Sequence, residues 1–98
     1  MISELLYNYN YPDRPILLLY KSSNNPQDYE IKVYHNDNMI YETVMCGGCW
    51  WVKEFETDNS NLRIEIYLHG ELQEIKNYEL TIEILDEIIL KGDVKSEL

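Results

Sequence analysis

The strictest pattern in this chain is a period-two alternation of side chains between Leu62 and Leu68. Apolar residues occupy every second position of this segment, and Arg63, Glu65 and Tyr67 stand between them. Successive side chains of a β-strand point to opposite faces, so the alternation predicts a strand with one face in a core and the other in solvent. A chain that contains such a strand must also supply further strands to complete the sheet.

Several other segments have strand-like patterns. The run 15–21 is continuously apolar and predicts a strand buried on both faces, whereas 29–35 alternates with period two. The polar residues 36–38 tolerate a left-handed backbone and predict a hairpin turn, and His69-Gly70 predicts another turn. Residues 71–85 are interpreted as two strands. Besides 62–68, strands are predicted over 15–21, 29–35, 39–45, 71–77, 80–84 and 88–90.

The composition supports an all-β fold. Alanine, the best helix former, does not occur in the 98 residues, whereas tyrosine occurs nine times. We therefore predict a single small antiparallel β-sandwich of seven or eight strands, with one domain over 1–92 and a flexible tail over 93–98. A helix over 79–91 is the alternative for the last apolar segment, because Leu85 and Ile89 would share one helical face.

The charge excludes some partners. With 8 Lys and Arg against 18 Asp and Glu, the chain has a formal net charge of −10, and binding to nucleic-acid phosphates needs an excess of bases. No apolar run reaches the roughly 18 residues of a membrane span, and the first residues lack the pattern of a targeting segment. We therefore expect a cytoplasmic protein that contacts neither nucleic acid nor membrane directly.

A Cys-Gly-Gly-Cys motif at 46–49 joins two apolar runs. Two glycines between such runs have the spacing of a two-residue hairpin loop, where both can take positive φ without steric cost. The motif predicts a β-hairpin over 40–55 in which the cysteines face each other and Glu42 faces Lys53. In this register, the two faces of the hairpin carry one tryptophan each, Trp50 or Trp51.

Cys46 and Cys49 also suggest chemistry. Together with His35 and His69 they would supply four zinc ligands, although their spacing matches no zinc-finger pattern. A redox dithiol needs a nearby cation or helix N-terminus and usually lies beside a βαβ pattern, which the sequence does not show. We interpret the two thiols as flanking a tight turn, with no metal and no cofactor.

Aromatic residues predict a partner-binding surface. Tyr7, Tyr9 and Tyr11 alternate with asparagines, so an extended segment would carry three rings on one side, either as an edge strand or as a contact strip. Trp50 and Trp51 are either core residues or contact residues. Rigid rings supply contact area at low entropic cost, which suits a sugar or a protein partner.

Acidic residues gather in the second half of the chain. Residues 54–87 contain ten acids and two bases, a local net charge of −8. Such a segment is typical of a solvated face, and the alternative is a surface complementary to a basic partner. The residues assigned to this acidic surface are Glu65, Glu71, Glu74, Glu79 and Glu83.

The segment 31–68 resembles a known family. It contains Ile40-Tyr41-Glu42-Thr43, the pair Trp50-Trp51 and the alternating strand 62–67, and in these motifs it is similar to the small β module that precedes the catalytic domain of bacterial autotransporter-type O-heptosyltransferases. The resemblance implies an accessory β-sandwich. The catalytic domain of that family has no counterpart in this chain, so the resemblance implies no catalytic residue here.

Taken together, these patterns predict a non-enzymatic protein. The chain has no phosphate-binding loop, nucleophile elbow or H-E-x-x-H motif, and a small all-β domain leaves little room for a substrate cleft. We expect an accessory or binding protein, bacterial or phage-encoded, that docks to another protein, or to a carbohydrate, through its aromatic surface. The alternative is a small acidic inhibitor that blocks a basic nucleic-acid-binding protein by charge mimicry.

Overall fold

The computed structural model describes residues 2–81, which form seven strands and no helix. This confirms the predicted all-β class and the strand count. The strands are β1 (Ile2–Leu6), β2 (Ile16–Tyr20), β3 (Tyr29–His35), β4 (Asn38–Met45), β5 (Trp50–Glu54), β6 (Ser60–Leu68) and β7 (Glu71–Leu80).

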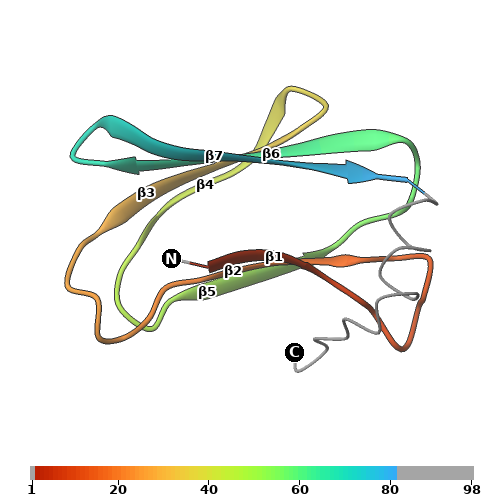
Figure 1. The fold of residues 1–98 in the computed structure, drawn as a ribbon, viewed down its shortest axis with the longest axis horizontal. Coiled ribbons are helices and arrows are strands. Elements are labelled where there is room, and N and C mark those ends of the chain that lie inside the picture. Colours follow the sequence, from red (N-terminus) through yellow and green to blue (C-terminus); the bar gives the residue numbers. More distant parts are fainter. Residues whose placement is uncertain (1, 82–98) are drawn as a thin grey trace.

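The strands form two antiparallel sheets that lie face to face (Figure 1). The smaller sheet has the order β1-β2-β5 and the larger the order β4-β3-β6-β7. The chain therefore changes sheet after β2, β4 and β5. Such crossings between two packed sheets are typical of the Greek-key connections of β-sandwiches.

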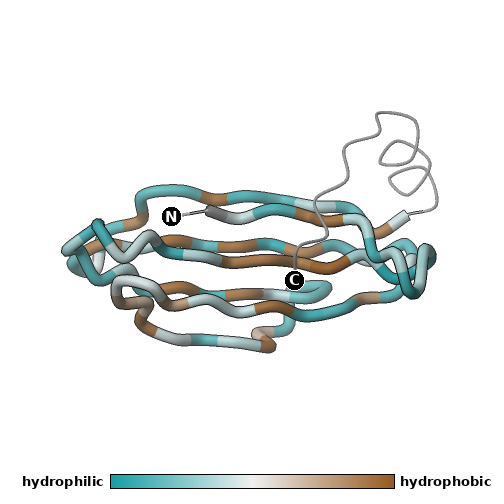
Figure 2. The backbone as a smooth tube through the Cα atoms, turned by 90° about the horizontal axis from the view of Figure 1, so that it is seen from below, coloured by the Kyte–Doolittle hydropathy of each residue, from teal (hydrophilic) through white to brown (hydrophobic). Residues whose placement is uncertain are grey.

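Inward-facing residues of both sheets fill the core. On β3 and β6 these are the alternating positions predicted from the sequence, such as Val33 and Ile64, both fully buried. Figure 2 shows polar and apolar residues alternating along the strands. The buried cluster contains Leu17, Leu19, Ile31, Val33, Met45, Phe55, Leu62, Ile64, Ile66 and Leu80.

Side chains close both open seams between the sheets. On one side, the Tyr78 hydroxyl of β7 donates a hydrogen bond to the backbone oxygen of Ser3 in β1 (2.8 Å), and Lys76 Nζ donates to the same oxygen (3.3 Å). On the other side, Tyr41 of β4 stacks on Trp51 of β5. Side-chain contacts of this kind hold the two sheets together where no backbone ladder joins them.

Two predicted hairpin turns are confirmed. Asn36 and Asp37 have φ of 49° and 65° and join β3 to β4, and His69 and Gly70 have φ of 52° and 78° and join β6 to β7. Two consecutive positive φ angles define a type I′ turn, whose twist matches that of the flanking strands.

The predicted hairpin over 40–55 is wrong. β4 pairs with β3 and β5 pairs with β2, so the two strands beside the 46–49 motif belong to different sheets. Glu42 lies opposite Lys32 rather than Lys53, and Trp51 lies opposite Leu19. Only one motif glycine, Gly48, has a positive φ (78°).

Lys21 accounts for this change of partner. Its backbone N–H donates to the Cys49 oxygen, and its oxygen accepts from the Gly48 N–H, both at 3.0 Å. β2 and the Lys21 backbone that follows it therefore hydrogen-bond to the edge of β5 with which β4 would have paired in a hairpin. The Cys49 N–H donates to the Cys46 oxygen (3.0 Å), and this bond with one positive φ at the third residue indicates a type II turn.

Three further predictions need correction. Residues 71–80 form one continuous strand rather than two. Residues 7–11 follow β1 as a loop rather than an edge strand. In β2 only alternate residues are fully buried, so the strand is not buried on both faces. The strand predicted at 88–90, most of the alternative helix 79–91 and the tail 93–98 lie outside the described residues.

Candidate binding surfaces

The structure separates the five predicted contact aromatics. Tyr9 and Tyr11 are exposed in the loop between β1 and β2. Tyr7 is half-buried, and its ring packs perpendicular to that of Tyr9 (5.1 Å between centroids). Trp50 is 64% exposed at the start of β5. Trp51 points inward and is half-buried. Three of the five predicted residues therefore present exposed rings.

The exposed rings lie at the two ends of the smaller sheet. Trp50 lies opposite Tyr20 at one end of β2. The loop over residues 7–15, which we call the tyrosine loop, leads into β2 at Ile16, at the other end of the strand. Four residues of strand separate these ends by about 13 Å. The rings therefore do not form one cluster, although they belong to the same sheet.

The outer surface of the smaller sheet is mostly apolar. The strand register places Leu18 between Glu4 and Val52, and the neighbouring rows contribute Ile16, Tyr20 and Trp50. All of these apolar residues except the exposed Trp50 are half-buried. We call this surface the small-sheet face; it consists of Ile16, Leu18, Tyr20, Trp50 and Val52.

Polar residues border the small-sheet face where β2 begins. Glu54 accepts a hydrogen bond from the Asn8 side chain (2.8 Å) and forms an ion pair with Arg14 (3.4 Å). The Arg14 guanidinium lies over the Tyr11 ring, 5.3 Å from its centroid. Asn8 also accepts from the Tyr11 backbone N–H (3.3 Å). These contacts hold the tyrosine loop against the end of the sheet.

The two cysteines contact each other at the 46–49 turn. Cys46 is exposed and Cys49 is half-buried. The pKa of the Cys46 thiol is raised, mainly by its hydrogen bond with the Cys49 side chain. A raised pKa leaves less thiolate, which is the nucleophilic form, at neutral pH.

A buried lysine lies beside this turn. Lys21 is fully buried, and its Nζ has no hydrogen-bond partner in the described structure. The nearest opposite charge is Asp28, whose Oδ1 is 3.9 Å away, and the Tyr29 ring centroid lies 5.8 Å away. Nothing in the sequence distinguished this lysine, because it follows the apolar run of β2 as an ordinary strand-end cation would.

The four weakly predicted zinc ligands do not meet. Cys46, Cys49 and His69 lie at the end of the larger sheet where β3 begins, whereas His35 ends β3. Six residues of strand correspond to about 20 Å. Residues 2–81 contain no group of three or more potential ligands among His, Cys, Asp and Glu. His35 instead packs its ring against Phe55 (5.6 Å).

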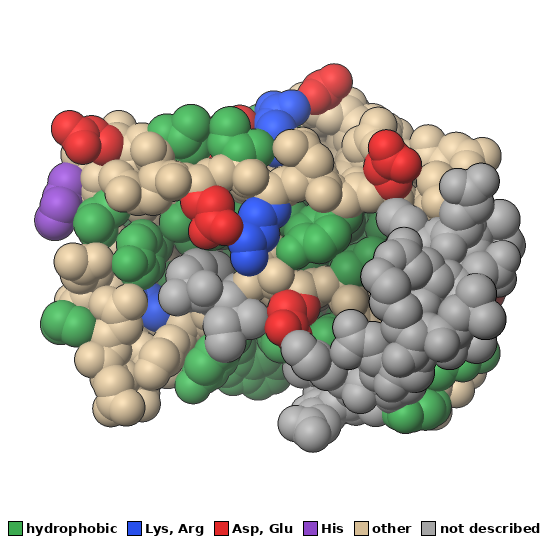
Figure 3. All heavy atoms as spheres, in the orientation of Figure 1, with side chains coloured by type: hydrophobic (Ala, Val, Ile, Leu, Met, Phe, Trp, Pro, Cys, Tyr) green, Lys and Arg blue, Asp and Glu red, His purple; other side chains and the backbone are tan. Residues whose placement is uncertain are grey.

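The predicted acidic residues are divided between two surfaces. Glu65 and Glu79 lie on the outer face of the larger sheet, whereas Glu74 alternates toward the seam and lies 3.7 Å from Lys76. Glu71 begins β7, and Glu83 lies outside the described residues. On the face drawn in Figure 3, acidic side chains stand apart from one another rather than in one patch.

The outer surface of the larger sheet, which we call the large-sheet face, mixes charged and aromatic residues with apolar edges. Three rows cross the strands in the order β4, β3, β6, β7. They are Val44–Glu30–Tyr67–Leu72, Glu42–Lys32–Glu65–Ile75 and Met39–Tyr34–Arg63–Asn77. Sequence alternation predicted that the β3 and β6 members of these rows face solvent, but it predicted neither the β4 and β7 members nor which residues are neighbours.

A polar network connects the middle of the large-sheet face. Glu65 accepts hydrogen bonds from the Tyr67 hydroxyl (2.7 Å) and from Arg63 Nε (3.0 Å). The Arg63 guanidinium lies 4.3 Å from the Tyr34 ring centroid, and Lys32 Nζ lies 4.9 Å from that of Tyr67. The hydrogen bond from Tyr67, followed by that from Arg63, lowers the pKa of Glu65. The hydrogen bond to Glu65 in turn raises the pKa of Tyr67.

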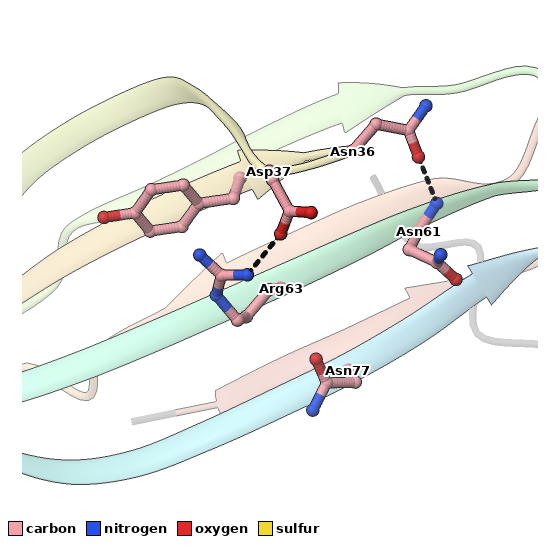
Figure 4. Close-up of a pocket in the computed structure, with 6 residues that line it drawn as sticks. Asn36, Asp37, Asn61, Arg63 and Asn77 are labelled. Carbon is pink, nitrogen blue, oxygen red and sulfur yellow. Dashed lines mark hydrogen bonds and ion pairs between the residues drawn. The ribbon is translucent and has the colours of Figure 1, made fainter.

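One end of this face contains a polar hollow of about 270 Å³ (Figure 4). Arg63 Nη1 donates to Asp37 Oδ1 (2.6 Å), and Asn36 Oδ1 accepts from the Asn61 backbone N–H (3.0 Å). Asn77 lies across from Arg63 on β7. The residues that line the hollow are Tyr34, Asn36, Asp37, Asn61, Arg63 and Asn77.

Sequence reasoning did not identify this hollow as a site. Its residues come from β3, β6, β7 and the turn after β3, over a span of 44 residues. The only local signal was the type I′ turn at Asn36-Asp37. The position of Asn77 opposite Arg63 depends on the register of β6 with β7.

The fold and its surfaces define a small β-sandwich with a mostly apolar face on one sheet. On the outer face of the other sheet, charged residues and two tyrosines lie between apolar edges. Comparison of the chain with protein-family models, with curated proteins and with solved structures finds no match. In the part of the chain that the structure describes, no helix has the length and apolar character needed to cross a membrane.

Proposed function

We propose that this chain is a non-enzymatic binding protein that docks to another protein through its small-sheet face. The observation that carries the proposal is the exposure of Trp50 beside Tyr20 on a sheet face where Leu18 and Val52 are also neighbours. Tryptophan and tyrosine are enriched among the residues that contribute most to protein–protein binding energy. An apolar patch bordered by polar residues is typical of such a surface.

The charge of the chain supports a partner of particular chemistry. Glu4 and Glu54 lie on opposite edges of the small-sheet face, and the whole chain carries a net charge of −10. Complementary charges steer association and disfavour acidic proteins. The partner would therefore present an apolar patch bordered by lysine or arginine.

The tyrosine loop extends this surface. Tyr9 and Tyr11 are exposed at the end of the sheet opposite Trp50, and hydrogen bonds through Asn8 hold their loop in place. A loop that is already ordered loses less conformational entropy when a partner binds. The loop would contact the outer part of the interface.

Affinity capture with matched variants tests the proposal. Trp50→Ala should abolish capture of a protein that wild type retains in about 0.5 M salt, where screening acts over only a few Å. Val44→Ala, an exposed aliphatic residue of the other sheet, should capture that protein as wild type does. Capture that Trp50→Ala leaves unchanged would contradict the proposal. Loss of capture in salt and after charge reversal of Glu71, Glu74 and Glu79 would favour the charge-mimicry alternative.

A further inference from the structure

The hollow on the large-sheet face contains uncommitted hydrogen-bonding groups. Within the described residues, the side-chain amides of Asn61 and Asn77 make no hydrogen bond, and both residues are exposed. A primary amide carries two donors and an acceptor. The hollow can therefore both donate to and accept from the same ligand.

The charges in the hollow are already paired. Arg63 bonds to Asp37 (2.6 Å) on one side and to Glu65 (3.0 Å) on the other. An anionic ligand would have to displace one of these carboxylates and approach a chain of net charge −10. A cationic ligand would compete with Arg63 for the same carboxylates. A neutral ligand requires neither change.

The backbone around the turn and the Arg63–Asp37 pair are held in place before any ligand binds. The Asn36 backbone N–H donates to the Asn61 oxygen (2.9 Å), Asn36 Oδ1 accepts from the Asn61 N–H, and Arg63 holds Asp37. The Tyr34 ring, against which the Arg63 guanidinium lies, adds an aromatic surface to the polar lining. Because these groups are already fixed, it is mainly the Asn61 and Asn77 side chains that lose conformational freedom when a ligand binds.

We propose that this hollow binds one unit of a neutral, polyhydroxylated ligand, namely a sugar residue. Each sugar hydroxyl is both a donor and an acceptor, which matches the free amides of Asn61 and Asn77. The C–H groups of a sugar ring suit the part of the Tyr34 ring that the Arg63 guanidinium does not cover. This site lies on the outer face of the sheet opposite to the small-sheet face, so the inference goes beyond the proposed protein docking.

Ligand-observed nuclear magnetic resonance and calorimetry with neutral methyl glycosides and N-acetylated hexosamines test this site. Wild type should bind at least one of them with a millimolar Kd. Asn77→Ala should weaken that binding about threefold to tenfold, the effect of losing one or two hydrogen bonds. Gln73→Ala, which removes another exposed amide of β7, should bind as wild type does, and circular dichroism should show the same fold for both variants.

Two other results would overturn the proposal. One is the absence of binding to every neutral sugar at about 50 mM, far above the Kd expected from a few hydrogen bonds. The other is tighter binding of inorganic phosphate or glucuronate than of neutral sugars. Trp50→Ala should retain sugar binding, so failure at this site and failure of the docking proposal are distinguishable.

Discussion

Tyr41 and Trp51 stack with their ring centroids 4.5 Å apart and their planes at 8°, although their strands belong to different sheets. Tyr41 lies on β4, an edge of the larger sheet, and Trp51 on β5, an edge of the smaller one. No backbone ladder joins these edges in the described structure. The stack therefore closes the seam, and it places Trp51 inside while its neighbour Trp50 points outward.

We predict an energetic coupling between Tyr41 and Trp51. Urea unfolding of Tyr41→Leu, Trp51→Leu and the double variant should give a coupling of about 0.5–1.5 kcal/mol, the range for an aromatic pair. Tyr34→Leu combined with Trp51→Leu is the control and should be additive, because Tyr34 lies on the outer face of its sheet. Additive behaviour of Tyr41 and Trp51 would show that the stack contributes no specific energy.

We predict that Gly48 is required for its backbone angle. Its φ of 78° is a conformation that costs most side chains about 1–2 kcal/mol, and a Cβ there would meet only Ser23 Cβ, at 3.8 Å. Gly48→Ala should therefore lower the free energy of unfolding by about 1 kcal/mol. Gly48→Asn should lower it less, since asparagine tolerates this region. Equal stability of Gly48→Ala and wild type would contradict the assignment.

We predict that the buried Lys21 ammonium lowers stability. It lacks a hydrogen-bond partner in the described structure and has only one carboxylate, 3.9 Å away, so its desolvation is poorly compensated. Lys21→Met, of similar length, should raise the free energy of unfolding by about 1 kcal/mol or more. Lys21→Ala should lower it, because the lost side chain leaves a cavity. If Lys21→Met lowered the free energy of unfolding as much as Lys21→Ala does, the ammonium group would not be a source of instability.

We predict that Glu65 contributes stability that acid removes. Its pKa is lowered in the folded chain, mainly by the Tyr67 hydroxyl. A lowered pKa stabilises the fold above the unfolded pKa of about 4.3, and this contribution is lost as the pH falls through the folded pKa. Glu65→Gln should therefore lose less stability than wild type between pH 6 and pH 3 in chemical unfolding.

Tyr67→Phe provides an independent measurement of the same interaction. It removes the hydroxyl that bonds to Glu65 (2.7 Å) and keeps the ring under Lys32. The pKa of Glu65, followed by nuclear magnetic resonance titration, should then rise toward its ordinary value. An unchanged pKa would mean that the hydrogen bond to Tyr67 does not form in solution.

Local patterns predicted much of the fold correctly. The alternation at 62–68 and 29–35 predicted strands and their buried faces. Residues 36–38 and His69-Gly70 predicted turns, which the structure shows to be type I′. These features depend on sterics within a few residues, so the sequence is sufficient to predict them. The burial of β2 was harder to predict, because a continuously apolar run does not show that one face of the strand remains half-exposed.

The 46–49 motif shows where local reasoning failed. A glycine pair between two apolar runs is compatible with both a hairpin and a crossing between sheets. The choice depends on whether β5 pairs with β4, its neighbour in sequence, or with β2, some thirty residues earlier, and the backbone of Lys21 favours β2. That competition between non-local partners cannot be read from either run alone.

The sequence by itself determined an all-β chain, most of its strands, and the faces that the alternating strands bury, because side-chain alternation is a local property of the backbone. Only the tertiary structure decided how the strands divide between the two sheets. That division placed Trp50 on an apolar outer face and Trp51 in the seam. It also brought Asn61, Arg63 and Asn77 around one hollow, because strand register joins residues that the chain keeps apart.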